Sequence, residues 1–141
     1  MTDLGEVAPL GFTIVRVAKM HRRWVSEDLA HLGLHVGQEL VLLNLCEQEG
    51  VRQTDLAVAL DIEVPTVHKT LARLEAAGFV ERRPDPDDGR ASLAFLTRRG
   101  REACAAILEI WQNAERRLSA AVSGRDTQVL DRLLKGLHSA T

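Results

Sequence analysis

Residues 52–90 read RQTDLAVALDIEVPTVHKTLARLEAAGFVERRPDPDDGR, and this stretch decides the fold. Its first part predicts a short helix over residues 54–60, in which apolar side chains share one face. The helical pattern breaks at residues 61–63. A second helix is predicted to begin at Pro65, whose fixed φ suits a first helical position, and to end before Gly78. Two short helices joined by a tight turn form a helix-turn-helix unit.

The second helix of this unit has an apolar stripe and a polar face. At 100° per residue, Val67, Leu71 and Leu74 share the stripe, which we expect to be buried. No acidic residue occurs between Val64 and Leu74. The outward face of the first two turns is therefore neutral or basic, as contact with a phosphate or a base edge requires. The candidate contact residues are Pro65, Thr66, His68, Lys69 and Arg73.

The residues after the second helix predict a β-hairpin. Residues 91–96 alternate as a strand with Leu93 and Phe95 on one face, whereas residues 79–83 alternate more weakly. Between them, residues 84–90 (PDPDDGR) contain two prolines, three aspartates and a glycine, which is the chemistry of a hairpin tip. The expected fold is mainly α with a small β-hairpin wing.

In their order and spacing, these motifs resemble the MarR family of bacterial transcription regulators over nearly the whole chain. The residues that carry the resemblance are Gly33-Leu34, Gln38, Val41-Leu42, Leu45, Asp55-Leu56-Ala57, Leu60, Thr66-Val67, Arg73-Leu74-Glu75, Gly78-Phe79-Val80, Arg82-Arg83, the wing segment 85–90, Leu96-Thr97 and Gly100. The resemblance implies a sequence-specific DNA-binding regulator, more often a repressor than an activator.

The resemblance also implies roles for wing residues. In the family, the first half of the second helix enters the major groove of double-stranded DNA, and a wing arginine reaches an adjacent minor groove. This implies Arg90 as the wing arginine and Asp88 as the carboxylate that orients it, with Arg82 as a further DNA contact.

Three positions depart from the family's pattern. Pro65 stands where serine is common, His68 where threonine is common, and Gly89 where a second wing arginine is frequent. One wing cation fewer predicts weaker attraction to phosphate, and Gly89 predicts a more mobile tip.

The whole chain, residues 1–141, is expected to form a single MarR-like domain. The winged helix-turn-helix DNA-binding lobe occupies residues 35–97, and dimerisation helices occupy residues 5–33 and 98–140. Apolar residues recur at helical spacing in both flanks and have no obvious partner in the winged unit, so a second copy would cover them. Such a homodimer places two recognition helices roughly 34 Å apart, which predicts an inverted-repeat operator.

Composition bounds the remaining classes of function. The chain has 141 residues, a hydrophobic content of 45% and a net charge of −2, so it is one domain-sized unit and no polycation. Neither a membrane-spanning run nor a secretory signal is recognisable, and a cytoplasmic location is expected. No phosphate-binding glycine loop, nucleophile elbow or paired acids point to an enzyme, and no cofactor is expected.

A small aromatic or phenolic ligand is a possible effector by resemblance, because such anions bind between the dimer helices and the DNA-reading lobe in the family. His21 and Trp24, with Arg22 and Arg23 between them, offer a basic and stacking environment there, and Trp111 is a second candidate. The alternative for Trp24 is packing at the junction of the first helix and the winged lobe.

Cysteine and histidine residues leave two further alternatives open, a thiol-responsive and a metal-responsive regulator. Cys46 and Cys104 border apolar stripes and are interpreted as small buried hydrophobes, not as a disulfide framework. His21, His31 and His35 could supply metal ligands, but their spacing does not support a site on one helix. No metal site is therefore expected.

A winged helix can also serve as a protein-interaction module. Such a module would be expected to replace Lys69, Arg73 and Arg90 with apolar or acidic residues. This chain keeps all three cations, which favours DNA.

Overall fold

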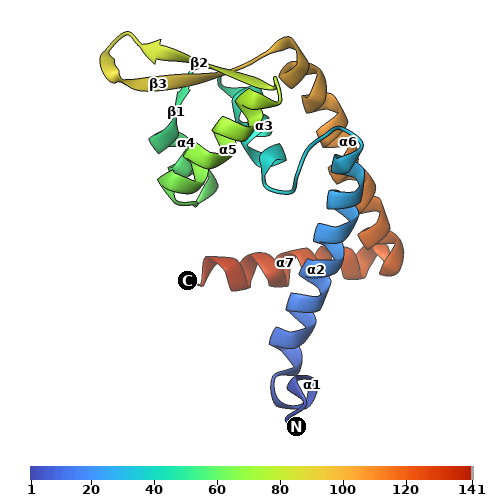
Figure 1. Cartoon of the computed structure of the whole chain (residues 1–141). Coiled ribbons are helices and arrows are strands. Elements are labelled where there is room, and N and C mark those ends of the chain that lie inside the picture. The colour runs from blue at the N-terminus through green and yellow to red at the C-terminus, as the bar shows by residue number, and fades with distance from the viewer. Residues whose placement is uncertain (141) are drawn as a thin grey trace.

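The computed structural model describes residues 1–140 and places a compact lobe at one end of long helices (Figure 1). Figure 1 shows α3, α4 and α5 with a small sheet in the lobe, α2 and α6 extending from it, and α7 at the far end of α6. The mainly helical fold with a β-hairpin wing is as predicted. The elements are α1 Leu4–Val7, α2 Pro9–Ala30, α3 Gln38–Glu47, β1 Val51–Arg52, α4 Gln53–Leu60, α5 Val64–Ala76, β2 Val80–Asp85, β3 Asp88–Leu96, α6 Arg98–Ala121 and α7 Gly124–Ser139.

Helices α4 and α5 form the helix-turn-helix. Helix α4 ends at Asp61, which adopts a left-handed conformation with φ of 52° and donates its backbone N–H to α4 carbonyls. Helix α5 then begins at Val64, with Pro65 in the first turn, where its missing N–H leaves no helical hydrogen bond unmade. The predicted stripe of Val67, Leu71 and Leu74 is fully buried, so the assignment of faces on α5 is confirmed.

The wing is a hairpin of β2 and β3, with β1 paired on the other side of β3 in an antiparallel sheet. The ladder runs from Val80↔Leu96 to Asp85↔Asp88, so the turn itself is only Pro86–Asp87. The predicted seven-residue tip was therefore too long. The reason is that Asp85 lies in the strand, where its carboxylate accepts the backbone N–H of Asp87 at 2.9 Å and closes the turn locally.

The start of α6 is fixed firmly to the lobe. Gly100 lies directly under the backbone carbonyl of Phe79, and a Cβ at this position would be 2.2 Å from that oxygen. Thr97 caps the helix by accepting the N–H of Gly100 at 3.1 Å, and its hydroxyl donates to the carbonyl of Gly78 at 2.6 Å. The lobe and the long helix are thus joined by backbone contacts that leave no space for a side chain.

The expectation that the flanking helices have no partner within the chain was wrong for the halves nearest the lobe. Val25 and Leu29 of α2 are buried in one core with Ala103, Ile107 and Ile110 of α6. The reason is that α2 and α6 lie side by side and α6 also packs on α3. The predicted apolar spacing of α6 is confirmed here, but this part of the stripe closes the chain's own core.

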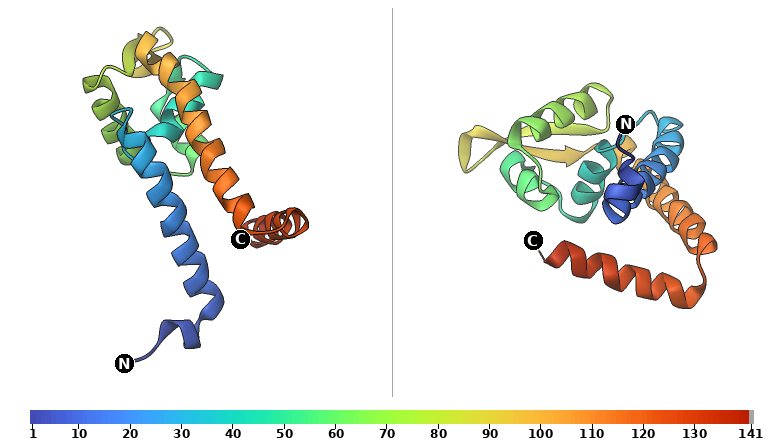
Figure 2. Two further views of the ribbon diagram at one scale, coloured as in Figure 1. Left: turned by 90° about the vertical axis from the view of Figure 1, so that its right-hand side faces the viewer. Right: turned by 90° about the horizontal axis from the view of Figure 1, so that it is seen from below.

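The parts of these helices farthest from the lobe keep apolar side chains exposed. Figure 2 shows α7 running apart from the lobe at the far end of α6. Within residues 1–140, no helix has the length and apolar character that crossing a membrane requires. The exposed large apolar residues of α1, α2 and α7 are Leu4, Val7, Leu10, Ile14, Val15, Val17, Val129, Leu130, Leu133, Leu134 and Leu137.

Candidate nucleic-acid interface and ligand pocket

The outward face of α5 carries the polar and basic residues that the sequence analysis singled out. All five of these side chains are exposed: Pro65, Thr66, His68, Lys69 and Arg73. Across residues 1–140, neither Lys69 nor Arg73 has a carboxylate within ion-pair distance. Both charges are therefore available to an anionic partner, and no internal pair has to be broken first.

His68 makes one contact that the sequence did not reveal. Its Nδ1 lies 3.4 Å from Nε2 of Gln53, the first residue of α4. When the Gln53 amide donates this hydrogen bond, the neutral ring carries its proton on Nε2 and can donate from there. Helix α4 thus orients a side chain on the exposed polar face of α5.

The wing places Arg90 beside the helix-turn-helix. Arg90 and Asp88 line a cavity of about 350 Å³ together with Gln53 of α4 and Val64, the first residue of α5. The Asp88 carboxylate accepts the backbone N–H of Arg90 at 3.1 Å. No ion pair joins it to a guanidinium in the part of the chain described. Asp88 therefore organises the backbone at the wing, and the Arg90 side chain is left free.

Arg82 of β2 contacts helix α5. Its Nη2 is 3.2 Å from Oε1 of Glu75 in the last turn of α5, and its side chain is 21% exposed. Arg83 of the same strand pairs with Glu81 and covers the ring of Phe95 at 4.3 Å. In this arrangement both arginines hold the wing in place, and neither extends from it as a free cation.

An ion pair with a buried carboxylate, at the turn end of the wing, was missed by sequence reasoning. Oδ2 of Asp85, whose side chain is 3% exposed, lies 2.6 Å from Nη2 of Arg52 in β1. The backbone N–H of Asp87 and then the Arg52 guanidinium hold the pKa of the Asp85 carboxyl below its ordinary value. Arg52 directly precedes α4, so the pair links the wing to the helix-turn-helix. The only signal in the sequence was an arginine near the start and an aspartate near the end of residues 52–90.

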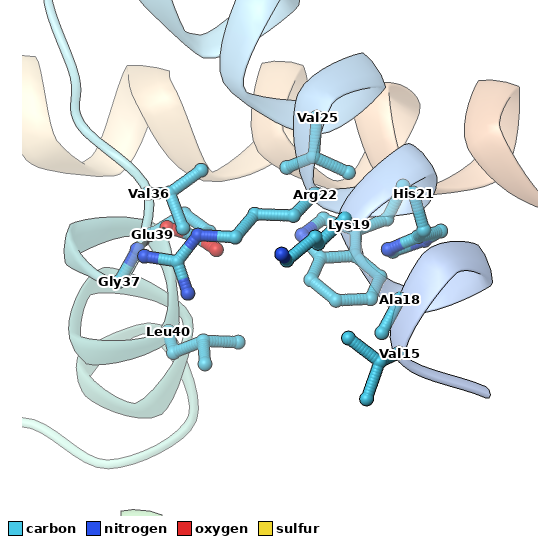
Figure 3. A pocket seen from close by; sticks show the side chains of 11 residues that line it. Val15, Ala18, Lys19, His21, Arg22, Val25, Val36, Gly37, Glu39 and Leu40 are labelled. Atoms are coloured by element: carbon cyan, nitrogen blue, oxygen red, sulfur yellow. Dashed lines mark hydrogen bonds between the residues drawn. The ribbon is translucent and has the colours of Figure 1, made fainter. Parts of the chain in front are cut away.

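A pocket of about 490 Å³ lies between α2, the start of α3 and α6 (Figure 3). His21 and Trp111 line it, and their ring centroids are 5.1 Å apart at an interplanar angle of 57°. Trp24 does not line this pocket. It packs against the core under the guanidinium of Arg117, 3.9 Å from the ring centroid, which is the packing role left open for it above.

The pocket combines aromatic and basic groups with one buried acid. Figure 3 shows Lys19 and Arg22 extending from α2 into the space between α2 and α3. Glu39 of α3 is 2% exposed, and its carboxylate accepts the N–H of Gly37 at 2.6 Å. Burial raises the pKa of Glu39. Sequence reasoning missed Lys19 and Glu39, because their place at one pocket depends on how α2 and α3 pack.

The two cysteines form a disulfide between α3 and α6, with their Cα atoms 6.7 Å apart. Cys46 is exposed, so its interpretation as a buried hydrophobe was wrong, whereas Cys104 is partly buried and packs against the core. The expectation that the two cysteines form no disulfide was also wrong. The reason is that the C-terminal end of α3 reaches the surface beside the second turn of α6. His21, His31 and His35 converge on no common site, since no group of three or more potential metal ligands is assembled within residues 1–140.

Comparisons with known proteins agree on one family. A sequence model of the MarR family matches residues 32–91. The HTH-type transcriptional repressor Rv2887 of Mycobacterium tuberculosis is 30% identical over 136 residues, which cover 96% of this chain and 98% of the relative. The multiple antibiotic resistance protein MarR of Escherichia coli is 28% identical over 131 residues, covering 92% and 91% of the two chains.

Solved structures give the same result. The crystal structure of a mutant Escherichia coli MarR complexed with operator DNA has a TM-score of 0.86 and 27% identity, and the match covers 97% of this chain and 99% of that one. The apo form of wild-type MarR has a TM-score of 0.77 and 28% identity, with 92% and 96% covered.

Proposed function

The chain belongs to the MarR family, and on that premise we propose that it is a transcription regulator, a repressor, that binds operator DNA as a homodimer. The observation that carries the proposal is the exposed face of α5, where Lys69 and Arg73 have no ion-pair partner among the described residues 1–140. A protein-interaction module would be expected to carry apolar or acidic residues at this place, so DNA is the favoured partner.

In this proposal, α5 enters the major groove and the wing reaches the minor groove beside it. Thr66 and His68 offer hydrogen-bonding groups to base edges, and Lys69 and Arg73 attract phosphates. Arg90 enters the minor groove, whose negative potential favours an inserted guanidinium. The proposed DNA-contacting set is Pro65, Thr66, His68, Lys69, Arg73 and Arg90, with Arg82 and Asp88 holding the wing.

The homodimer follows from the exposed apolar side chains at the ends of the helices farthest from the lobe. Leu133 of α7 is 58% exposed and Leu10 of α2 is 67% exposed, which is unfavourable in water unless a second copy covers them. A two-fold dimer presents two α5 helices about one turn of DNA apart, and its operator is an inverted repeat. In keeping with this role we expect no catalytic activity and a cytoplasmic location.

The pocket between α2, α3 and α6 is the proposed site of a small aromatic or phenolic anion. His21 and Trp111 would contact an aromatic ring, and Lys19 and Arg22 would attract a carboxylate or phenolate. The pocket lies between the lobe and the dimer helices, so a ligand there would favour one arrangement of the two over another. A strong switch requires the ligand to discriminate between them by about 5 kcal/mol.

Selection of binding sites from random duplex DNA tests the DNA-binding proposal. We expect the wild-type chain to enrich an inverted repeat. Lys69→Ala and Arg90→Ala should each weaken binding and lower the salt slope of the affinity by about one unit, because each removes one phosphate or groove contact.

Arg98→Ala is the matched control for these variants. It removes an arginine that is 89% exposed and paired with Glu102 at the start of α6, so DNA affinity should not change. If no repeat is enriched, or if Arg98→Ala weakens binding as much as Lys69→Ala, the proposed reading face is wrong.

A further inference from the structure

We propose that Cys46 and Cys104 are a reversible redox pair, a site that oxidants modify and that controls the junction between the lobe and α6. Cys46 is the penultimate residue of α3, and Cys104 lies in the second turn of α6. Although 58 residues separate them in sequence, their Cα atoms lie 6.7 Å apart and the two sulfurs are bonded. The fold thus brings two thiols within disulfide reach without displacing the backbone.

The two cysteines differ in exposure, which assigns their roles. The exposed Cys46 is open to an oxidant in solution. Cys104 is half-buried, and its sulfur lies 3.3 Å from the carbonyl oxygen of Gly100, one turn earlier in α6. Cys46 is therefore the residue that reacts first, and Cys104 resolves the product.

Hydroperoxides are the proposed oxidant class, and the chemistry balances as follows. The Cys46 thiol takes one oxygen from ROOH, becoming a sulfenic acid and releasing ROH, as two electrons pass from sulfur to the O–O bond. The Cys104 thiol then attacks the sulfenic sulfur, so the S–S bond forms and water leaves. A small dithiol reverses the step by exchange: it becomes the oxidised disulfide, and both cysteines return to thiols.

The position of the bond gives it an effect on DNA binding, and this part rests on the proposed function. The start of α6 is already held by Gly100 under the Phe79 carbonyl and by Thr97 on Gly78. The disulfide adds a third attachment, between α3 and α6. Near it, Nη1 of Arg101 in α6 lies 3.8 Å from Oε1 of Glu49, which follows α3. The direction in which α6 leaves the lobe is therefore fixed in the oxidised chain and freer in the reduced chain.

The arrangement that holds the disulfide is closer to that of the operator-bound relative than to that of the apo form. The TM-scores are 0.86 with the operator-bound mutant of MarR and 0.77 with apo MarR. A covalent attachment that holds this arrangement removes part of the cost of adopting it on DNA. Oxidation is expected to strengthen operator binding, and reduction to weaken it, by about fivefold or more.

The test uses the full chain, reduced and then treated with hydrogen peroxide near one equivalent. We expect intact-mass analysis to show a loss of two hydrogens and peptide mapping to join Cys46 to Cys104 within one protomer. Dithiothreitol under native conditions should restore two thiols. Operator affinity, measured in both states, should rise on oxidation in the wild type and not respond in Cys46→Ser or Cys104→Ser.

Other outcomes overturn the proposal. Two thiols that stay free, a bond between protomers, or a disulfide that resists reduction until the chain unfolds would each refute a reversible pair. Equal operator affinity of the two wild-type forms would refute control of the junction.

A failure of the proposed function would look different. If neither form binds any DNA, amide hydrogen exchange of residues 97–110 still tests whether the disulfide controls the junction. Amides of this segment should be better protected in the oxidised chain, and equal protection in both states would contradict the inference.

Discussion

A single methyl group at Gly100 should weaken the chain, although the same change elsewhere in a helix should strengthen it. Gly100→Ala places a Cβ 2.2 Å from the carbonyl oxygen of Phe79 and 3.0 Å from a methyl group of Leu96. A backbone oxygen cannot move aside as the end of a flexible side chain can, so α6 must shift away from the lobe. Overpacking of this kind costs about 1–3 kcal/mol, and alanine's helix propensity offsets up to about 1 kcal/mol of it.

The matched control is Gly136→Ala, because Gly136 lies within α7 and no atom is within 4 Å of the added Cβ. This variant should gain about 0.5–1 kcal/mol from propensity alone. We expect Gly100→Ala to lose about 2 kcal/mol, equivalent to a Tm lower by roughly 6 °C.

Urea unfolding at one fixed protein concentration measures both variants, since a dimer's apparent stability depends on concentration. The reasoning is refuted if Gly100→Ala is as stable as Gly136→Ala. In that case the lobe and α6 would not approach as closely as the Phe79 contact requires.

Three further predictions concern the disulfide, the Asp85 carboxylate of the wing and the pocket. Opening the Cys46–Cys104 bond, which closes a loop across 58 residues, should lower the free energy of unfolding by about 4 kcal/mol, as urea titrations with and without reductant would measure. The pKa of Asp85 is lowered in the folded chain, so the ionised carboxylate stabilises the fold fully at pH values above its pKa in the unfolded chain, about 3.9. This stabilisation is lost as the pH falls through the pKa of the folded chain. Acid unfolding curves of Asp85→Asn should lack this step. Trp111→Ala should abolish thermal stabilisation by small aromatic acids and Trp24→Ala should retain it; the reverse result would move the effector site away from the pocket.

Local sequence pattern was sufficient for the recognition unit. The spacing of Val67, Leu71 and Leu74 defines the buried side of α5, and Pro65 and Gly78 mark its ends, because these signals act within one or two helical turns. The exposed reading face followed as the complement of the buried one.

Contacts between segments that are distant in sequence could not be predicted from such local patterns. Trp24 and Trp111 both stand on amphipathic helices, and only the packing of α2 against α6 decides which ring lines the pocket. The cysteine pair depends in the same way on α3 meeting α6. The length of the hairpin turn was overestimated. The buried carboxylate of Asp85 is held by Arg52 of another strand, so the β2–β3 ladder continues through prolines and aspartates, which are unfavourable in strands.

The Arg52–Asp85 pair links the wing to the segment that precedes α4, and the Arg82–Glu75 pair links it to α5, so the wing and the helix-turn-helix are held together in the lobe from which α6 extends. Helix α6 has 24 residues and is therefore roughly 36 Å long. If α6 pivots at Gly100, under the Phe79 carbonyl, a tilt of about 5° displaces the far end of the helix by roughly 3 Å. In the proposed homodimer, a movement of this size would change the distance between the two copies of α5 without disturbing the core beside the pocket.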